Sequence, residues 1–268
     1  METQGEAVEL SEAEVDARLA GVDLDLLGEQ QYKWFRPTSA AVDEWVDYAQ
    51  RGDDCYYMGL SDIDQKMRGI WPSDVLVVTG RAHSGKSAVI LSSMATNLLQ
   101  NPDFHGVIYT PDEPEILVVS KLYALLYQRN LAEVEDGLRT QDPAVMQEIE
   151  EAKVSFLDRI KIFPNAMSFE HMSEAMRECE DYWQAKAGFV MVDFLEQLPQ
   201  ASGYEGVSKV LKGLKEWSEA EKMPTALIHQ SGKGSTRGSS RGMDDGKFNA
   251  DEYAILQLNV FRKRDDPK

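Results

Sequence analysis

The segment VLVVTGRAHSGKS, residues 75–87, constrains the fold of this chain more than any other stretch. Four apolar residues, typical of a buried parallel strand, lead into Gly80, and the spacing G-x-x-x-x-G-K-S then runs from Gly80 to Ser87. Glycines allow backbone N–H groups to turn inward, and the free N–H groups at the start of the following helix favour an anion. The segment therefore predicts a nucleoside triphosphate site formed by Gly80, Ser84, Gly85, Lys86 and Ser87.

Two side chains of this P-loop have specific expected roles. We expect Lys86 to reach the β- and γ-phosphates, which makes it both a binding and a catalytic residue. We expect Ser87 to place its hydroxyl on Mg²⁺. ATP and Mg²⁺ are therefore the predicted nucleotide and cofactor.

Strand-like and helix-like segments alternate along the rest of the chain, which predicts an α/β fold with a mostly parallel sheet and helices on both faces. The expected strands cover residues 75–78, 106–109, 160–165, 188–200, 224–232 and 252–264. The expected helices cover residues 87–100, 114–128, 131–158 with a restart at Asp142-Pro143, 168–187 and 205–221. The length of 268 residues suits one such domain with an appendage.

The first part of the chain differs from the rest in its charge. Residues 1–55 hold 14 acidic and four basic residues, and 38–52 have the pattern of a helix. We predict an acidic helical arm over 1–55 and an ATPase domain over 56–268. The arm has two readings, a solvated appendage and a linker that docks on a neighbouring subunit.

Composition limits the compartment and the partners. A net charge of −18 repels nucleic acid on average, so any contact with DNA or RNA must be local. The two cysteines, Cys55 and Cys179, form no C-x-x-C pair, which argues for a reducing compartment and against a zinc site. No apolar run approaches the ~20 residues of a membrane span, and the first residues have no secretory signal pattern. We expect a cytoplasmic protein.

Acidic residues follow two of the expected strands. The run VMVD places Asp193 at the carboxyl end of a strand, where it is expected to hold Mg²⁺ together with Ser87. Asp112 and Glu113 follow the strand 106–109, and one of the two is expected to orient the attacking water; the other reading is a loop of solvated acids. Glu196 is a lesser candidate for the same role.

Polar and basic residues follow the last two strands. Gln230 ends the fifth strand and is expected to sense the γ-phosphate, although a simple strand-end amide has the same pattern. The glycine- and serine-rich stretch 232–247 carries four cations, which predicts either a flexible surface loop or a contact with a nucleic-acid backbone through Lys233, Arg237, Arg241 and Lys247. The run FRKR, 261–264, can cap the sheet edge or complete a neighbour's site as an arginine finger.

Taken together, these motifs resemble the RecA/DnaB superfamily, and most closely the ATPase domain of DnaB-type replicative helicases. The resemblance runs from about Gly59 to Arg264 and rests on six pieces in order: GLSDID, GRAHSGKS, IYTPDEPE, VMVDFLEQL, LIHQS and FRKR. It implies a RecA-like P-loop core, hexameric rings around single-stranded DNA and a DNA-binding role for 232–247. Residues 1–55 are too short for the separate N-terminal domain of the family's full helicases.

The resemblance also implies roles for individual residues. Asp193 corresponds to the Walker B acid, Gln230 to the family's glutamine after the fifth strand, and Arg262 and Arg264 to the pair that reaches into the adjacent subunit. The family's catalytic glutamate lies in a pattern like S-L-E-M-P. Here T-P-D-E-P places Asp112 at that position and Glu113 one residue later, so the choice between them stays open.

Four functions are compatible with these residues. The first is an ATP-hydrolysing motor on single-stranded DNA, of the helicase-ring type, in replication or recombination. The second is a recombinase-like filament protein built from the same parts. The third is a nuclease in which carboxylates hold metal for phosphodiester cleavage, and the fourth is a loader or switch that binds ATP with negligible turnover.

Overall fold

The computed structural model describes residues 38–39, 41–42, 45–46, 55–67, 69–193, 198, 203–230 and 254–260, the side chains of 203–207 excepted. The described residues between 38 and 46 are helical, as the sequence pattern predicts. The other residues of the arm except Cys55, the basic stretch 232–247 and the run 261–264 lie outside the described residues, so the division of the chain at residue 55 stays a prediction.

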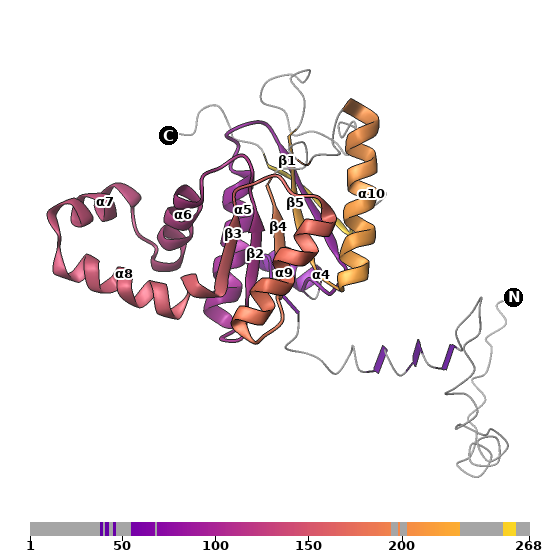
Figure 1. The fold of residues 1–268 in the computed structure, drawn as a ribbon, viewed down its shortest axis with the longest axis horizontal. Coiled ribbons are helices and arrows are strands. Elements are labelled where there is room, and N and C mark those ends of the chain that lie inside the picture. Colours follow the sequence, from indigo (N-terminus) through magenta and orange to yellow (C-terminus); the bar gives the residue numbers. More distant parts are fainter. Residues whose placement is uncertain are drawn as a thin grey trace, which may run out of the picture. The chain divides into compact units, whose positions relative to one another are not determined.

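The described part forms a six-stranded sheet in the order β3-β2-β4-β5-β1-β6, and every neighbouring pair is parallel (Figure 1). The strands are β1 Val75–Gly80, β2 Gly106–Tyr109, β3 Ile160–Phe163, β4 Phe189–Val192, β5 Thr225–Gln230 and β6 Leu256–Val260. The helices are α4 Ser61–Met67, α5 Lys86–Gln100, α6 Glu115–Tyr127, α7 Leu131–Thr140, α8 Pro143–Ser155, α9 Phe169–Trp183 and α10 Gly203–Glu221, with a 3₁₀ turn η1 Leu157–Arg159. The predicted α/β fold is therefore confirmed.

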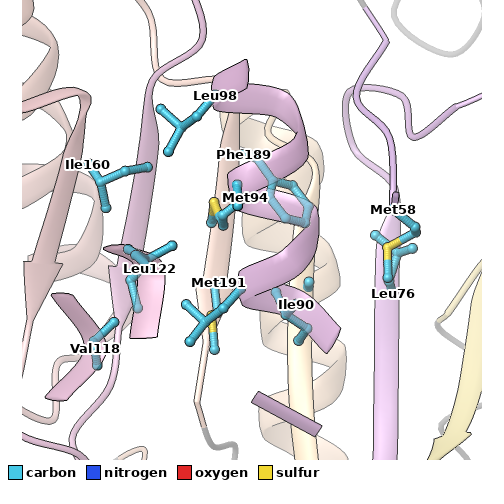
Figure 2. Close-up of a cluster of buried hydrophobic side chains, with 14 of the residues drawn as sticks. Met58, Leu76, Ile90, Met94, Leu98, Val118, Leu122, Ile160, Phe189 and Met191 are labelled. Atoms are coloured by element: carbon cyan, nitrogen blue, oxygen red, sulfur yellow. The ribbon is translucent and has the colours of Figure 1, made fainter. Parts of the chain in front are cut away.

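Apolar residues on both faces of the strands produce two separate cores, because successive side chains of a strand point to opposite faces. On one face α5 and α6 pack against the sheet; Figure 2 shows part of this cluster, with Leu76, Ile90, Met94, Leu98, Val118, Leu122, Phe189 and Met191. On the other face α9 and α10 pack through Met172, Met176, Leu211, Leu214 and Trp217 against Val77, Val107, Val190 and Leu227. The sheet is thus covered on both faces.

Several predicted segments differ in length from the observed elements, and two of them show the physical reason. The fourth strand ends at Val192, so the prediction of a strand over 188–200 was too long; its neighbour β2 offers only the four residues that pair with Phe189–Val192. The helix predicted over 168–187 ends at Trp183, because Gln184 adopts a left-handed conformation. The restart at Asp142-Pro143 is confirmed: the Asp142 side chain caps α8, and α7 and α8 project away from the sheet beside α6 (Figure 1).

The motif GLSDID attaches the chain to α5 before the first strand. The Asp64 carboxylate accepts hydrogen bonds from the backbone N–H groups of Met58 (2.7 Å) and Leu60 (2.9 Å). The Asn97 side chain of α5 accepts from the N–H of Tyr57 (2.9 Å) and donates to its carbonyl (2.8 Å), to which Ser93 Oγ also donates (2.6 Å). Asp64 of the motif thus holds the turn that follows Tyr57, and Tyr57 ties the chain to α5, whose first residues belong to the candidate site.

Candidate functional site

Because all six strands are parallel, their carboxyl ends meet at one edge of the sheet, where ligands bind in open α/β sheets. This edge collects the P-loop after β1, the acidic turn after β2, Asp193 after β4 and Gln230 at the end of β5. Gly80 and Gln230 are direct partners in the β1–β5 register. The structure therefore brings together the described candidate residues that the sequence places at four separate strand ends.

The P-loop backbone has glycines at two positions where a side chain would clash or where the backbone is left-handed. A Cβ atom on Gly80 would collide with the carbonyl oxygen of Val260 and lie 2.6 Å from Ser84 Oγ. Gly85 precedes α5 in a left-handed conformation (φ 100°), where a Cβ atom would meet nothing within 4 Å, and no side chain caps the helix. The first N–H groups of α5 are thus not capped by a side chain, which is the arrangement that attracts an anion.

Polar atoms inside the P-loop fit a phosphate. Lys86 is buried, and its Nζ donates to the carbonyl of Arg81 at 2.7 Å. Ser84 Oγ is buried and has no hydrogen-bond partner among the described residues. A buried hydroxyl without a partner is costly, so a ligand oxygen here would remove that cost.

Ser87 and Asp193 meet across the gap between α5 and β4, as the metal prediction requires. Ser87 Oγ donates to Asp193 Oδ2 at 2.6 Å, and the Asp193 N–H donates to the Tyr109 carbonyl at 2.8 Å. Hydroxyl and carboxylate oxygens are the ligands that Mg²⁺ accepts, so the donor set fits that ion. Among the described residues no group of three or more His, Cys, Asp or Glu side chains could hold a metal, and Mg²⁺ sites on nucleotides need no such group.

The electrostatics of Asp193 reflect the same arrangement. Burial raises the pKa of Asp193, and the negative charges of Glu113 and Asp112 raise it further. The hydrogen bond from Ser87 and the positive charge of Lys86 lower it. The site therefore holds a carboxylate that is costly to ionise until a cation is present.

The two acids after β2 have different surroundings. Asp112 is exposed, whereas the Glu113 side chain is only 20% exposed and forms an ion pair with Lys121 of α6. Lys121 was missed as a site residue from sequence. The available signal was the single cation in a largely apolar helix, EILVVSKLYALLY.

The remaining predicted residues fall into two groups. Gln230 is half-buried at the edge, and its neighbour His229 is buried. Glu196, Lys233, Arg237, Arg241, Lys247, Arg262 and Arg264 lie outside the described residues, so their roles stay predictions.

No helix in the described part of the chain is long and apolar enough to cross a membrane.

A family model described as the DnaB-like helicase C-terminal domain matches residues 57–241. None of the curated proteins matches the chain in sequence.

Solved structures share the fold. One, described as an ATPase domain, has a TM-score of 0.70 and 15% identity, and the match covers 84% of this chain and 84% of that chain. Another, described as a DnaB-like replicative helicase and its interactions with primase, has a TM-score of 0.68 and 14% identity. That match covers 93% of this chain and 61% of that chain. The predicted RecA/DnaB-type fold is confirmed.

Proposed function

Because this chain belongs to the family of DnaB-like helicase C-terminal domains, we propose that it hydrolyses ATP and couples the hydrolysis to movement on single-stranded DNA. One observation carries the first half of the proposal. Ser87 at the start of α5 donates to Asp193 at the end of β4, beside the buried Lys86 and the uncapped helix end. These are the parts that hold a nucleotide phosphate chain in P-loop enzymes.

Each described residue has a task in this proposal. The N–H groups at the start of α5 and the ammonium of Lys86 bind the β- and γ-phosphates. Ser87 and Asp193 would hold Mg²⁺, which neutralises charge on the phosphates when bound. Gln230, which lies beside Gly80 in the sheet register, would contact the γ-phosphate in this proposal.

Contacts with DNA and with neighbouring subunits would be made by residues outside the described part of the chain. We propose that Lys233, Arg237, Arg241 and Lys247 contact the DNA backbone, since phosphodiester contacts need local cations in a chain of net charge −18. We propose further that the chain forms a ring, hexameric by the family resemblance, in which Arg262 and Arg264 reach the neighbour's nucleotide. Arg264 would then stabilise the charge of the transition state.

The test is ATP hydrolysis by the full chain with and without single-stranded DNA, while the labelled strand is followed on a gel. The proposal predicts hydrolysis that DNA stimulates and that Lys86→Ala abolishes, with the strand intact. Lys153→Ala is the matched control, because Lys153 lies exposed on α8 and pairs with Glu150. Hydrolysis without stimulation by DNA would contradict the coupling, and a shortened strand would favour the nuclease.

A further inference from the structure

The turn that follows β2 presents its two acids in opposite ways. The N–H of Glu113 donates to the carbonyl of Thr110 at 3.4 Å, which closes a four-residue turn with Pro111 and Asp112 at its tip. Proline favours the second position of such a turn, because its ring presets the backbone angle. Asp112 therefore lies at the exposed tip, whereas Glu113 lies at the base of the turn and is half-buried.

Glu113 is also the acid with the stronger electrical link to the metal side of the site. Both acids raise the pKa of Asp193, and Glu113 raises it more than Asp112 does. The interaction between two charges grows as they approach and as water is excluded from between them, so the half-buried Glu113 acts on Asp193 more than the exposed Asp112 does. Of the two acids, Glu113 is therefore both the less exposed one and the one that acts more strongly on Asp193.

A cation from α6 holds the Glu113 side chain in place. Lys121 Nζ donates to Glu113 Oε1, and its own side chain is 40% exposed. The helix that carries Lys121 is anchored in the core through Val118 and Leu122, so the cation is presented from a rigid element. This ion pair is partly buried and joins the acidic turn to α6, so its main consequence for the site is the position of the Glu113 carboxylate.

We propose that Glu113, not Asp112, orients the water that attacks ATP, and that Lys121 is a positioning residue that fixes the Glu113 carboxylate. With Oε1 bound to Lys121, the second oxygen of Glu113 is available to accept a hydrogen bond from water. Phosphoryl transfer depends on positioning more than on a strong base, so a paired carboxylate suits the task. This inference rests on the ATP hydrolysis proposed above.

The step balances as an ordinary hydrolysis. The water oxygen forms a bond to the γ-phosphorus, and the bond from that phosphorus to the bridging oxygen breaks, so that its electron pair leaves on ADP. One water hydrogen stays on the phosphate, and the other leaves as a proton through Glu113 to solvent.

The test compares kcat and KM for ATP in full-length variants. Glu113→Gln should lower kcat by about 10²-fold or more with little change in KM, and Asp112→Asn should cost at least about tenfold less. Lys121→Met should lower kcat by about tenfold, and Lys121→Arg should restore most of it, which a merely structural role would not explain. The double variant Lys121→Met/Glu113→Gln should lose no more than Glu113→Gln alone, because the two residues act as a unit.

The control is Lys153→Met, which removes the ion pair with Glu150 on α8 and should keep the wild-type kcat. The inference would be overturned if Asp112→Asn lowered kcat as much as Glu113→Gln does, or more. It would also be overturned if Lys121→Met kept the wild-type kcat, or if the double variant lost the product of the two single losses in kcat. A wild-type chain that hydrolyses no more ATP than Lys86→Ala would refute the proposed function itself. If the wild-type chain hydrolyses ATP and Glu113→Gln keeps the wild-type kcat, this inference is refuted and the proposed function is not.

Discussion

At the amino end of α5 a buried hydroxyl has no partner among the described residues, whereas around the carboxyl end a single arginine donates to several carbonyl groups. At the amino end Ser84 Oγ is buried without a partner in the described residues, and Gly85 provides no side-chain cap. Around the carboxyl end the Arg159 guanidinium donates to the carbonyls of Leu98, Asn101, Pro102, Phe104 and Ser155 at 2.9–3.4 Å.

Within this one helix, the amino end is suited to bind a ligand, whereas the carboxyl end contributes to the stability of the fold. A cation stabilises the carboxyl end because the helix dipole is negative there, and Arg159 supplies it from within the chain. The amino end favours an anion, and no described residue supplies a side-chain cap there, so a phosphate can fill that role. Substitutions at the two ends should therefore affect different measurements.

The largest effect is expected at the amino end, on activity. Lys86→Ala should lower kcat for ATP by about 10²- to 10³-fold, because the phosphates lose their charged donor. The midpoint of thermal unfolding without nucleotide should not fall, since a buried ammonium group costs free energy in the nucleotide-free fold and is useful only when phosphate is bound. Steady-state kinetics and a thermal unfolding scan measure the two quantities, and a large fall in the unfolding midpoint would contradict the separation.

The reverse outcome is expected at the carboxyl end. Arg159→Leu should lower the free energy of unfolding by about 3 kcal/mol, because the part-buried carbonyls of Leu98, Asn101 and Phe104 lose a charged donor. KM for ATP should stay the same in the fraction that remains folded. Urea unfolding checks the first value, with Arg177→Leu as the control: Arg177 is exposed, lies 3.7 Å from Glu221, and should cost less than about 1 kcal/mol. Equal losses from both variants would show that Arg159 acts only as a surface charge.

A smaller effect of opposite sign is expected at Asp193. Burial raises its pKa above the unfolded value, so the ionised carboxylate destabilises the nucleotide-free fold at neutral pH. Asp193→Asn should raise the free energy of unfolding by about 1 kcal/mol while it removes ATP hydrolysis. Calorimetry without nucleotide would contradict this if the unfolding midpoint fell.

The smallest effect is expected beside Arg159, at Asp158. The hydrogen bond from Lys161 at 2.9 Å, and further those from Tyr182, hold the pKa of Asp158 below its usual value. The contribution of Asp158 to the free energy of unfolding is therefore present above the unfolded pKa of about 3.9, and it is lost as the pH falls through the lower pKa of the folded state. Asp158→Asn should cost less than about 0.5 kcal/mol at pH 7, because the pair is exposed, and nothing well below both pKa values. Urea unfolding at pH 7 and at low pH checks this, and a cost that persists at low pH would contradict the electrostatic cause.

The two ends of α5 also differ in how far sequence could predict them. The amino end follows from eight contiguous residues, Gly80 to Ser87, whose local geometry needs no distant partner. Arg159 reaches carbonyls more than 50 positions away, and no local pattern identifies such a contact. The sheet and its helices could be predicted because strand and helix periods are local, but their ends depend on the neighbouring strands, as at Val192.

The acidic turn lies between these cases. The sequence located it and could not choose between Asp112 and Glu113, because the choice depends on which residue occupies the tip of the turn. It also left Lys121 without a role, since the partner of a cation on a helix depends on how that helix packs. Both points needed the three-dimensional arrangement.

The amino end of α5 and the neighbouring strand ends are proposed to form the nucleotide site. Hydrogen–deuterium exchange of the full chain with and without Mg²⁺ and ADP tests this most directly. We expect slower exchange in 80–88, where the N–H groups would bind phosphate, and little change in 98–104 at the carboxyl end of α5. Unchanged exchange in 80–88 at saturating nucleotide, or protection centred on 98–104, would contradict the assignment.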